Sequence, residues 1–153
     1  MEPNVVMDAV KGVIAAIAAT IVVALLMMAN KSMGWVPGLD LVASFMLLAG
    51  SLEMMTGWIV FGVVLALIGG LVFSLLDAHL DRPVGAEELV RGGLFGIGAF
   101  LMVGVLVMPM SGGDAFGMKY GIGGPILLAI VFIIYGAVMG GLYGLMRPEP
   151  ATE

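Results

Sequence analysis

The sequence predicts an all-α membrane protein with four transmembrane helices. Hydrophobic residues make up 61% of the 153-residue chain and charged residues only 11%, whereas soluble domains usually carry about 25% charged residues. Apolar runs of the length that a helix needs to cross the hydrocarbon core recur along the chain. These runs do not alternate apolar and polar residues, so they do not resemble the strands of a transmembrane barrel.

Four windows meet the length requirement, and together they form a single membrane domain over residues 1–153. They are residues 9–29, 54–76, 89–108 and 125–146. A helix closes its own backbone hydrogen bonds, as the interior of a lipid bilayer demands. The segment before the first window is acidic and lacks the basic region of a secretory signal, so we expect the first span to be retained.

The connection between the first two spans contains a further short apolar stretch. Pro37 and Gly38 break any continuing helix, and Asp40 can cap a new one. Residues 39–48 are apolar but too short to span. The sequence predicts a short interfacial helix here, with a re-entrant helix as the alternative, and it predicts that Trp35 lies at headgroup depth.

Basic residues indicate the orientation. Four lie on one side of the predicted spans and two on the other: Lys11, Arg82, Arg91 and Arg147 against Lys31 and Lys119. Because cytoplasmic loops carry the excess of Lys and Arg, we expect both termini in the cytoplasm of a bacterium and the chain in its inner membrane.

Two segments indicate an internal repeat. "VKGVIAAIAA" (residues 10–19) and "VRGGLFGIGA" (residues 90–99) share the pattern V-[KR]-G-x-[IL]-x-[AG]-I-[AG]-A. A weaker echo links "IGGLVF" (residues 68–73) with "MGGLYG" (residues 139–144). We interpret this as a duplicated two-helix hairpin, with units 9–76 and 89–146 related by a pseudo-twofold axis along the membrane normal. Chance similarity among helices rich in Gly and Ala is the alternative.

Small residues at every fourth position mark candidate helix-packing faces. In lipid there is little hydrophobic drive to bring helices together, so close backbone approach must supply the contact. The candidates are Gly62, Gly70, Gly92, Gly96, Gly136, Gly140 and Gly144. One such face is expected to remain available for a partner, so replacing Gly136 and Gly140 with Leu should abolish association without blocking insertion.

Three titratable residues are candidates for a functional role. Glu53 precedes the second span, where a carboxylate at membrane depth indicates function but a helix start is the simpler interpretation. Asp77 and His79 lie in "DAHLDR", which suits either a proton relay or, more simply, a solvated hairpin with local ion pairs.

The chemistry available to the chain is narrow. It has no cysteine and one histidine, which excludes thiolate catalysis and any metal centre built from several His or Cys residues of this chain. The net charge of −5 argues against nucleic-acid binding. No paired intramembrane carboxylates or nucleophile motif occurs, so we expect a protein that is not an enzyme and has no cofactor.

Methionine leaves a copper site open as an alternative, since thioethers bind Cu(I). Many of the 14 methionines lie toward the predicted outer side: Met27, Met28, Met33, Met54, Met55, Met108, Met110 and Met118. Methionine is also a flexible filler of gaps beside glycine, which is the simpler interpretation.

Several of these segments together resemble a family of small four-span bacterial membrane proteins that is uncharacterised. They are "VKGVIAAIAAT", "GW" (residues 57–58), "RGGLFG", "VMPMSGGDAFG" and "YGAVMGGLYG". The resemblance covers nearly the whole chain and implies no activity. It implies histidines near "GW" and before the "YG" of the fourth span (residues 135–136) in relatives, where this chain has apolar residues such as Phe61 and Ile133.

The expected function is that of a non-catalytic accessory or scaffolding subunit. Its partners would be membrane lipids and either larger integral subunits, as in a respiratory or photosynthetic electron-transfer complex, or other copies of itself. A small oligomeric channel or transporter is the first alternative, and a copper-handling membrane protein is the second.

Overall fold

The computed structural model describes residues 3–50, 52–79 and 87–146, and within these ranges every regular element is helical. Four helical segments are long and apolar enough to cross a membrane. The first is α1 (Pro3–Met33), and the fourth is α7 (Gly123–Leu145). The second comprises α3 (Met54–Gly62), the π-helix η1 (Val63–Ile68) and α4 (Gly69–Ala78). The third comprises α5 (Glu87–Met102), the π-helix η2 (Val103–Val107) and α6 (Met108–Met110). The prediction of an all-α protein with four such helices is therefore confirmed.

Two spans extend clearly beyond the predicted windows. Helix α1 begins at Pro3, a residue that suits the first turn of a helix because it needs no backbone donor there. The third span continues through Pro109 to Met110, where we predicted its end at Met108. A proline ring clashes with the carbonyl four residues earlier, and the turn before Pro109 is the wider π-helix η2.

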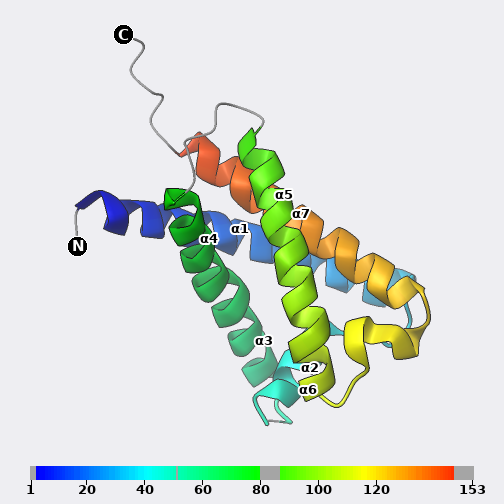
Figure 1. Cartoon of the computed structure of the whole chain (residues 1–153). Coiled ribbons are helices and arrows are strands. Elements are labelled where there is room, and N and C mark those ends of the chain that lie inside the picture. Colours follow the sequence, from blue (N-terminus) through cyan, green and yellow to red (C-terminus); the bar gives the residue numbers. More distant parts are fainter. Residues whose placement is uncertain (1–2, 51, 80–86, 147–153) are drawn as a thin grey trace.

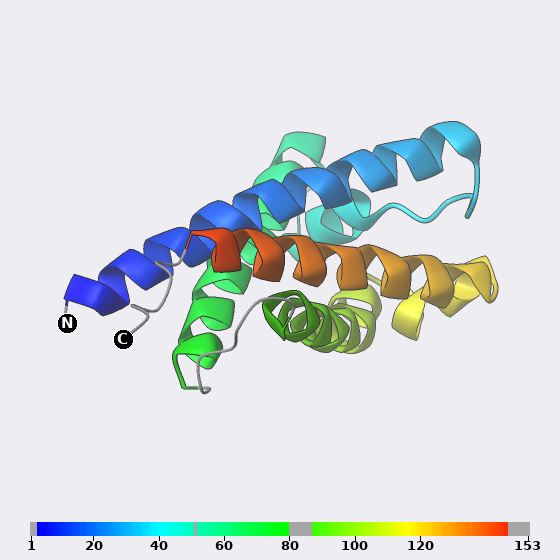
Figure 2. The same ribbon diagram turned by 90° about the horizontal axis from the view of Figure 1, so that it is seen from above.

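The bundle has two distinct sides, which Figures 1 and 2 show. Helix α1 begins, α4 ends, α5 begins and α7 ends on one side, here called the terminus side. The short helix α2 (Leu41–Leu48) and the 3-10 helix η3 (Ala115–Tyr120) lie on the other, here called the loop side. Helices α1 and α7 run antiparallel, side by side (Figure 2).

The four spans do not form a closed ring. Helix α1 packs against both α4 and α7, and α7 packs closely against α5. Helices α4 and α5 contact each other sparsely, and an ion pair between Asp77 and Arg91 joins them on the terminus side. The bundle is therefore open between α4 and α5.

Glycine determines the two closest crossings. At the crossing of α5 and α7, a Cβ added to Gly136 would lie 2.6 Å from the Gly96 nitrogen. At the crossing of α1 and α4, a Cβ on Gly12 would lie 2.6 Å from the Gly70 carbonyl oxygen. The backbones touch at both crossings, as small residues permit in a membrane.

The contacts bear on the internal repeat without establishing it. Gly12 and Gly92 are equivalent in the predicted repeat. Gly12 packs against Gly70, and Gly92 packs against Gly140. Each of these partners belongs to a Gly-Gly pair in the second helix of the same repeat unit. The π-helices do not follow the repeat, because they lie in the second and third spans, which are not equivalent. The duplication stays a prediction.

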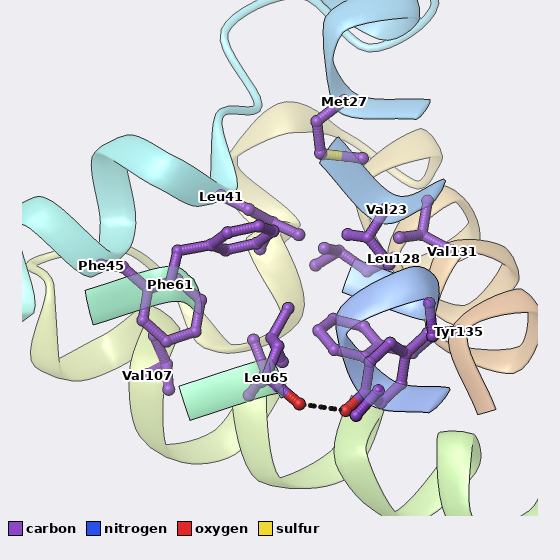
Figure 3. Close-up of a cluster of buried hydrophobic side chains, with 14 of the residues drawn as sticks. Val23, Met27, Leu41, Phe45, Phe61, Leu65, Val107, Leu128, Val131 and Tyr135 are labelled. Atoms are coloured by element: carbon purple, nitrogen blue, oxygen red, sulfur yellow. Dashed lines mark hydrogen bonds between the residues drawn. The ribbon is translucent and has the colours of Figure 1, made fainter. Parts of the chain in front are cut away.

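The predicted short helix between the first two spans is α2. Asp40 caps this helix as predicted, because the Asp40 Oδ1 accepts a hydrogen bond of 3.1 Å from the Ala43 N–H. Three of its residues are buried in the bundle: Leu41, Val42 and Phe45. Phe45 packs edge-to-face on Phe61 with ring centroids 5.6 Å apart. Figure 3 shows this cluster continuing to Leu65 and Val107.

Asn30 fixes the chain between α1 and α2. Its Nδ2 donates to the carbonyls of Val36 and Leu39, each at 3.2 Å, and its Oδ1 accepts from the Val36 N–H at 2.8 Å. Asn30 is only 2% exposed, and these bonds satisfy its buried amide. Trp35, in the same segment, is exposed, as a residue at headgroup depth would be.

Candidate functional site

The buried polar residues of the spans are candidates for a functional site, because an uncompensated polar group is costly in an apolar interior. The described ones are Thr20, Asn30, Ser74, Asp77 and Glu88. Thr20 donates to the Ala16 carbonyl at 2.7 Å, and Ser74 donates to the Leu71 carbonyl at 2.9 Å. Both bonds stay within the residue's own helix. Asp77 and Glu88 remain as the buried carboxyl groups, and both lie on the terminus side.

Asp77 forms an ion pair with Arg91. The Asp77 Oδ1 lies 3.5 Å from the Arg91 Nη1, and the two side chains are 2% and 23% exposed. Our simpler interpretation, a solvated hairpin, is wrong for Asp77, because the last turn of α4 faces α5 and buries this carboxylate. A buried charge needs its partner, and removing one member of such a pair is strongly destabilising.

Glu88 lies in the first turn of α5 and is 7% exposed. Its carboxyl carbon lies 3.1 Å from the point where a Cβ on Gly144 would be, so Gly144 leaves room for this carboxyl group. The sequence analysis missed Glu88. The signal was present, because Glu88, Gly92 and Gly96 are spaced by four and share one helix face.

The other two predicted titratable residues, His79 and Glu53, are exposed, unlike Asp77 and Glu88. His79 is the exposed C-cap residue of α4, and its Nδ1 lies 2.7 Å from the Leu75 carbonyl oxygen. Glu53 is the exposed N-cap residue of α3, on the loop side. The structure therefore does not bring Glu53, Asp77 and His79 together. Arg82, in the predicted polar hairpin, lies outside the described residues.

A pocket adjoins the ion pair. It has a volume of about 200 Å³ and is lined by Phe73, Leu76, Asp77, Arg91, Leu94 and Phe95. The first three belong to α4 and the others to α5. The rings of Phe73 and Phe95 meet edge-to-face with centroids 5.3 Å apart. The pocket thus lies where the bundle is open, with charged groups and aromatic rings in its wall.

The predicted packing glycines divide into three groups. Five lie at helix crossings within the chain: Gly70, Gly92, Gly96, Gly136 and Gly140. Gly144 faces Glu88. Gly62 packs against no other helix within the chain, because a Cβ there would meet nothing within 4 Å, and its role at a packing face stays a prediction.

Substitution of Gly136 and Gly140 is a poor test of association with a partner. Both glycines lie against α5 of the same chain. Leucine at either position would separate α5 from α7 before it affected any partner. A loss of association in these variants would therefore not show that a partner binds at Gly136 and Gly140, and their expected effect on association stays a prediction.

The π-helix η1 is held by a tyrosine. The Tyr135 hydroxyl of α7 donates to the Leu65 carbonyl of η1 (Figure 3). A Cβ on Gly69 would overlap this hydroxyl, so glycine is needed beside it. Such π segments are frequent at functional sites, but here the widened turn serves a contact between two spans.

The outward methionines do not share one environment. Met27 and Met108 are buried, and the Met108 Sδ accepts a hydrogen bond of 3.5 Å from the Ser44 hydroxyl. The other six are exposed: Met28, Met33, Met54, Met55, Met110 and Met118. Within the described residues no three His, Asp or Glu side chains gather in a way that could hold a metal ion.

These features define the class: a four-helix membrane protein that is open on one side and has two buried carboxyl groups, those of Asp77 and Glu88, at one end. The chain belongs to the family described as "Family of unknown function (DUF6789)", whose family model matches residues 6–153. No curated protein and no solved structure matches the chain.

Proposed function

We propose that the chain is a non-catalytic accessory subunit that packs against larger integral membrane subunits. The observation that carries this proposal is the open side of the bundle, where α4 and α5 contact each other only sparsely. A partner helix along this side would complete the bundle. An electron-transfer complex of the bacterial inner membrane is the setting to search first.

The outer face of α5 has the shape that suits such a partner. Leu94 and Leu101 are 63% and 50% exposed, and Gly98 lies between them with open space beside it. A partner side chain can enter this notch and contact the α5 backbone, the kind of packing that associates helices in lipid.

The polar groups of the spans favour this function over a channel or transporter. Thr20 and Ser74 bond within their own helices, and Asp77 pairs with Arg91. A pathway for ions or solutes needs polar groups along its length. These groups are instead used for the chain's own structure.

The test is gentle extraction of the chain from its native membrane, followed by native mass spectrometry. We expect larger subunits to remain bound in fixed stoichiometry. Gly98→Leu should lose them while the chain stays folded. Gly93→Leu is the matched control, because Gly93 lies on another face of the same helix and a Cβ at either glycine meets nothing within 4 Å in the chain. Recovery of a homo-oligomer alone would refute the proposal and favour a channel or transporter. Bound copper would favour a copper-handling protein.

The proposed orientation, with both termini in the cytoplasm, has a separate test. The chain has no cysteine, so single-cysteine variants can be labelled without background. We expect an impermeant thiol reagent to label intact cells carrying Ser32→Cys, on the loop side, and not those carrying Ala78→Cys, on the terminus side. The reverse pattern would contradict the orientation.

A further inference from the structure

We propose that the pocket between α4 and α5 binds one phospholipid, with its phosphodiester on Arg91 and an acyl chain against Phe73 and Phe95. This inference does not rest on the proposed function, because it is tested on the purified chain without a partner subunit.

The wall of the pocket changes from charged to apolar along the span. Phe73 lies one helical turn before Asp77 in α4, and Phe95 lies one turn after Arg91 in α5. Because the two helices are antiparallel at this point, both aromatic rings lie deeper in the bundle than the ion pair. A phospholipid has the same order of groups, with a polar headgroup at the surface and hydrocarbon below it.

Arg91 supplies N–H donors for a phosphodiester, and it interacts with two carboxyl groups, those of Asp77 and Glu88. The guanidinium carries five N–H donors and can serve a carboxylate and a phosphate oxygen together. Asp77, almost fully buried behind it, holds the guanidinium at the pocket, while the Arg91 side chain keeps 23% of its surface accessible. Basic pockets between transmembrane helices are known to bind lipid headgroups.

The size of the pocket also favours a lipid. Pockets that enclose a drug-sized ligand measure about 300–1,000 Å³, and this one measures about 200 Å³. It therefore fits part of a long molecule that continues along the open side of the bundle. Leu94, at 63% exposed, forms the outer lip over which such a chain would leave.

The experiment measures how many lipids the full-length chain retains. The protein is purified in mild detergent and exchanged into mixed micelles with phosphatidylethanolamine and phosphatidylglycerol or, in a second arm, with diacylglycerol. Native mass spectrometry then counts the bound molecules. We expect one phospholipid per chain and at least about tenfold less diacylglycerol, since a charge-assisted hydrogen bond contributes about 1.5–3 kcal/mol.

Two variants test the two ends of the pocket. Arg91→Gln should lower phospholipid retention about tenfold, by the loss of the same bond. Leu94→Trp should lower it by placing an indole in the outer lip. Lys11→Gln and Leu25→Trp are matched controls, because Lys11 is a basic residue of the terminus side and Leu25 an exposed leucine of α1, and neither lines the pocket.

A folding defect must be kept apart from a binding defect. Arg91→Gln leaves the Asp77 carboxylate buried without this cation, so the double variant Asp77→Asn/Arg91→Gln is measured beside it and should show the same loss of lipid. The proposal is overturned if the folded variants retain phospholipid like the unaltered chain, if the controls lose it equally, or if diacylglycerol binds as well as phospholipid.

Discussion

Substitution of Gly92 by alanine tests whether backbone contact holds α5 against α7. A Cβ on Gly92 would lie 2.8 Å from the Gly140 Cα and 2.9 Å from the Gly140 nitrogen. Carbon atoms in favourable contact are about 3.5–4.0 Å apart, so the two helices would have to separate by about 0.7 Å or more. The Gly136 carbonyl oxygen would lie closer still, and because all three neighbours are backbone atoms, no side-chain rotation can relieve the clash.

The change in stability expected for Gly92→Ala follows from two opposing effects. Overpacking of this kind costs about 1–3 kcal/mol. Alanine also raises helix propensity by up to about 1 kcal/mol over glycine. Gly98→Ala, in the same helix, gains the same propensity, but its Cβ meets nothing within 4 Å. The difference between the two variants therefore isolates the packing cost, and Gly92→Ala should be less stable than Gly98→Ala by about 1–3 kcal/mol.

The assay is unfolding of the purified chain in mixed micelles by a rising mole fraction of dodecyl sulfate, followed by circular dichroism. Both variants and the unaltered chain are measured at one lipid concentration, because lipid binding adds to apparent stability. Equal midpoints for Gly92→Ala and Gly98→Ala would refute the reasoning, since α5 and α7 would then not be in backbone contact.

Three further substitutions test single contacts. Tyr135→Phe removes the hydroxyl bonded to the Leu65 carbonyl and should cost about 1 kcal/mol in the same assay; an unchanged midpoint would show that this bond does not hold η1. Asn30→Ala removes three hydrogen bonds to the segment before α2 and should cost about 1–3 kcal/mol, with faster hydrogen exchange at the Val36 amide; retained protection there would contradict the assigned role. Asp40→Ala removes the N-cap of α2 and should cost about 1 kcal/mol, seen as faster exchange in α2 alone; a loss of protection throughout the bundle would contradict a local effect.

The candidate site could be predicted only in part. Asp77 was a candidate because an aspartate and a histidine near the bilayer can form a proton relay. Its partner Arg91 lies 14 positions later and was used in the sequence analysis only as an orientation signal. Glu88 was missed because two adjacent glutamates at a helix start resemble a solvated first turn. The burial of Glu88 depends on which face of α5 meets α7, and Gly92 and Gly96, on the same face as Glu88, determine that face.

The sequence by itself determined the class of the protein and the number of its spans, because a membrane helix must be long, apolar and internally hydrogen-bonded whatever surrounds it. It also determined the cap at Asp40, which is a local interaction. Only the tertiary structure decided which glycines pack within the chain, that Gly62 does not, and that α4 and α5 stay apart while Asp77 reaches Arg91. These contacts join residues distant in sequence, and in an apolar solvent they depend on shape at close range, which composition and periodicity do not describe.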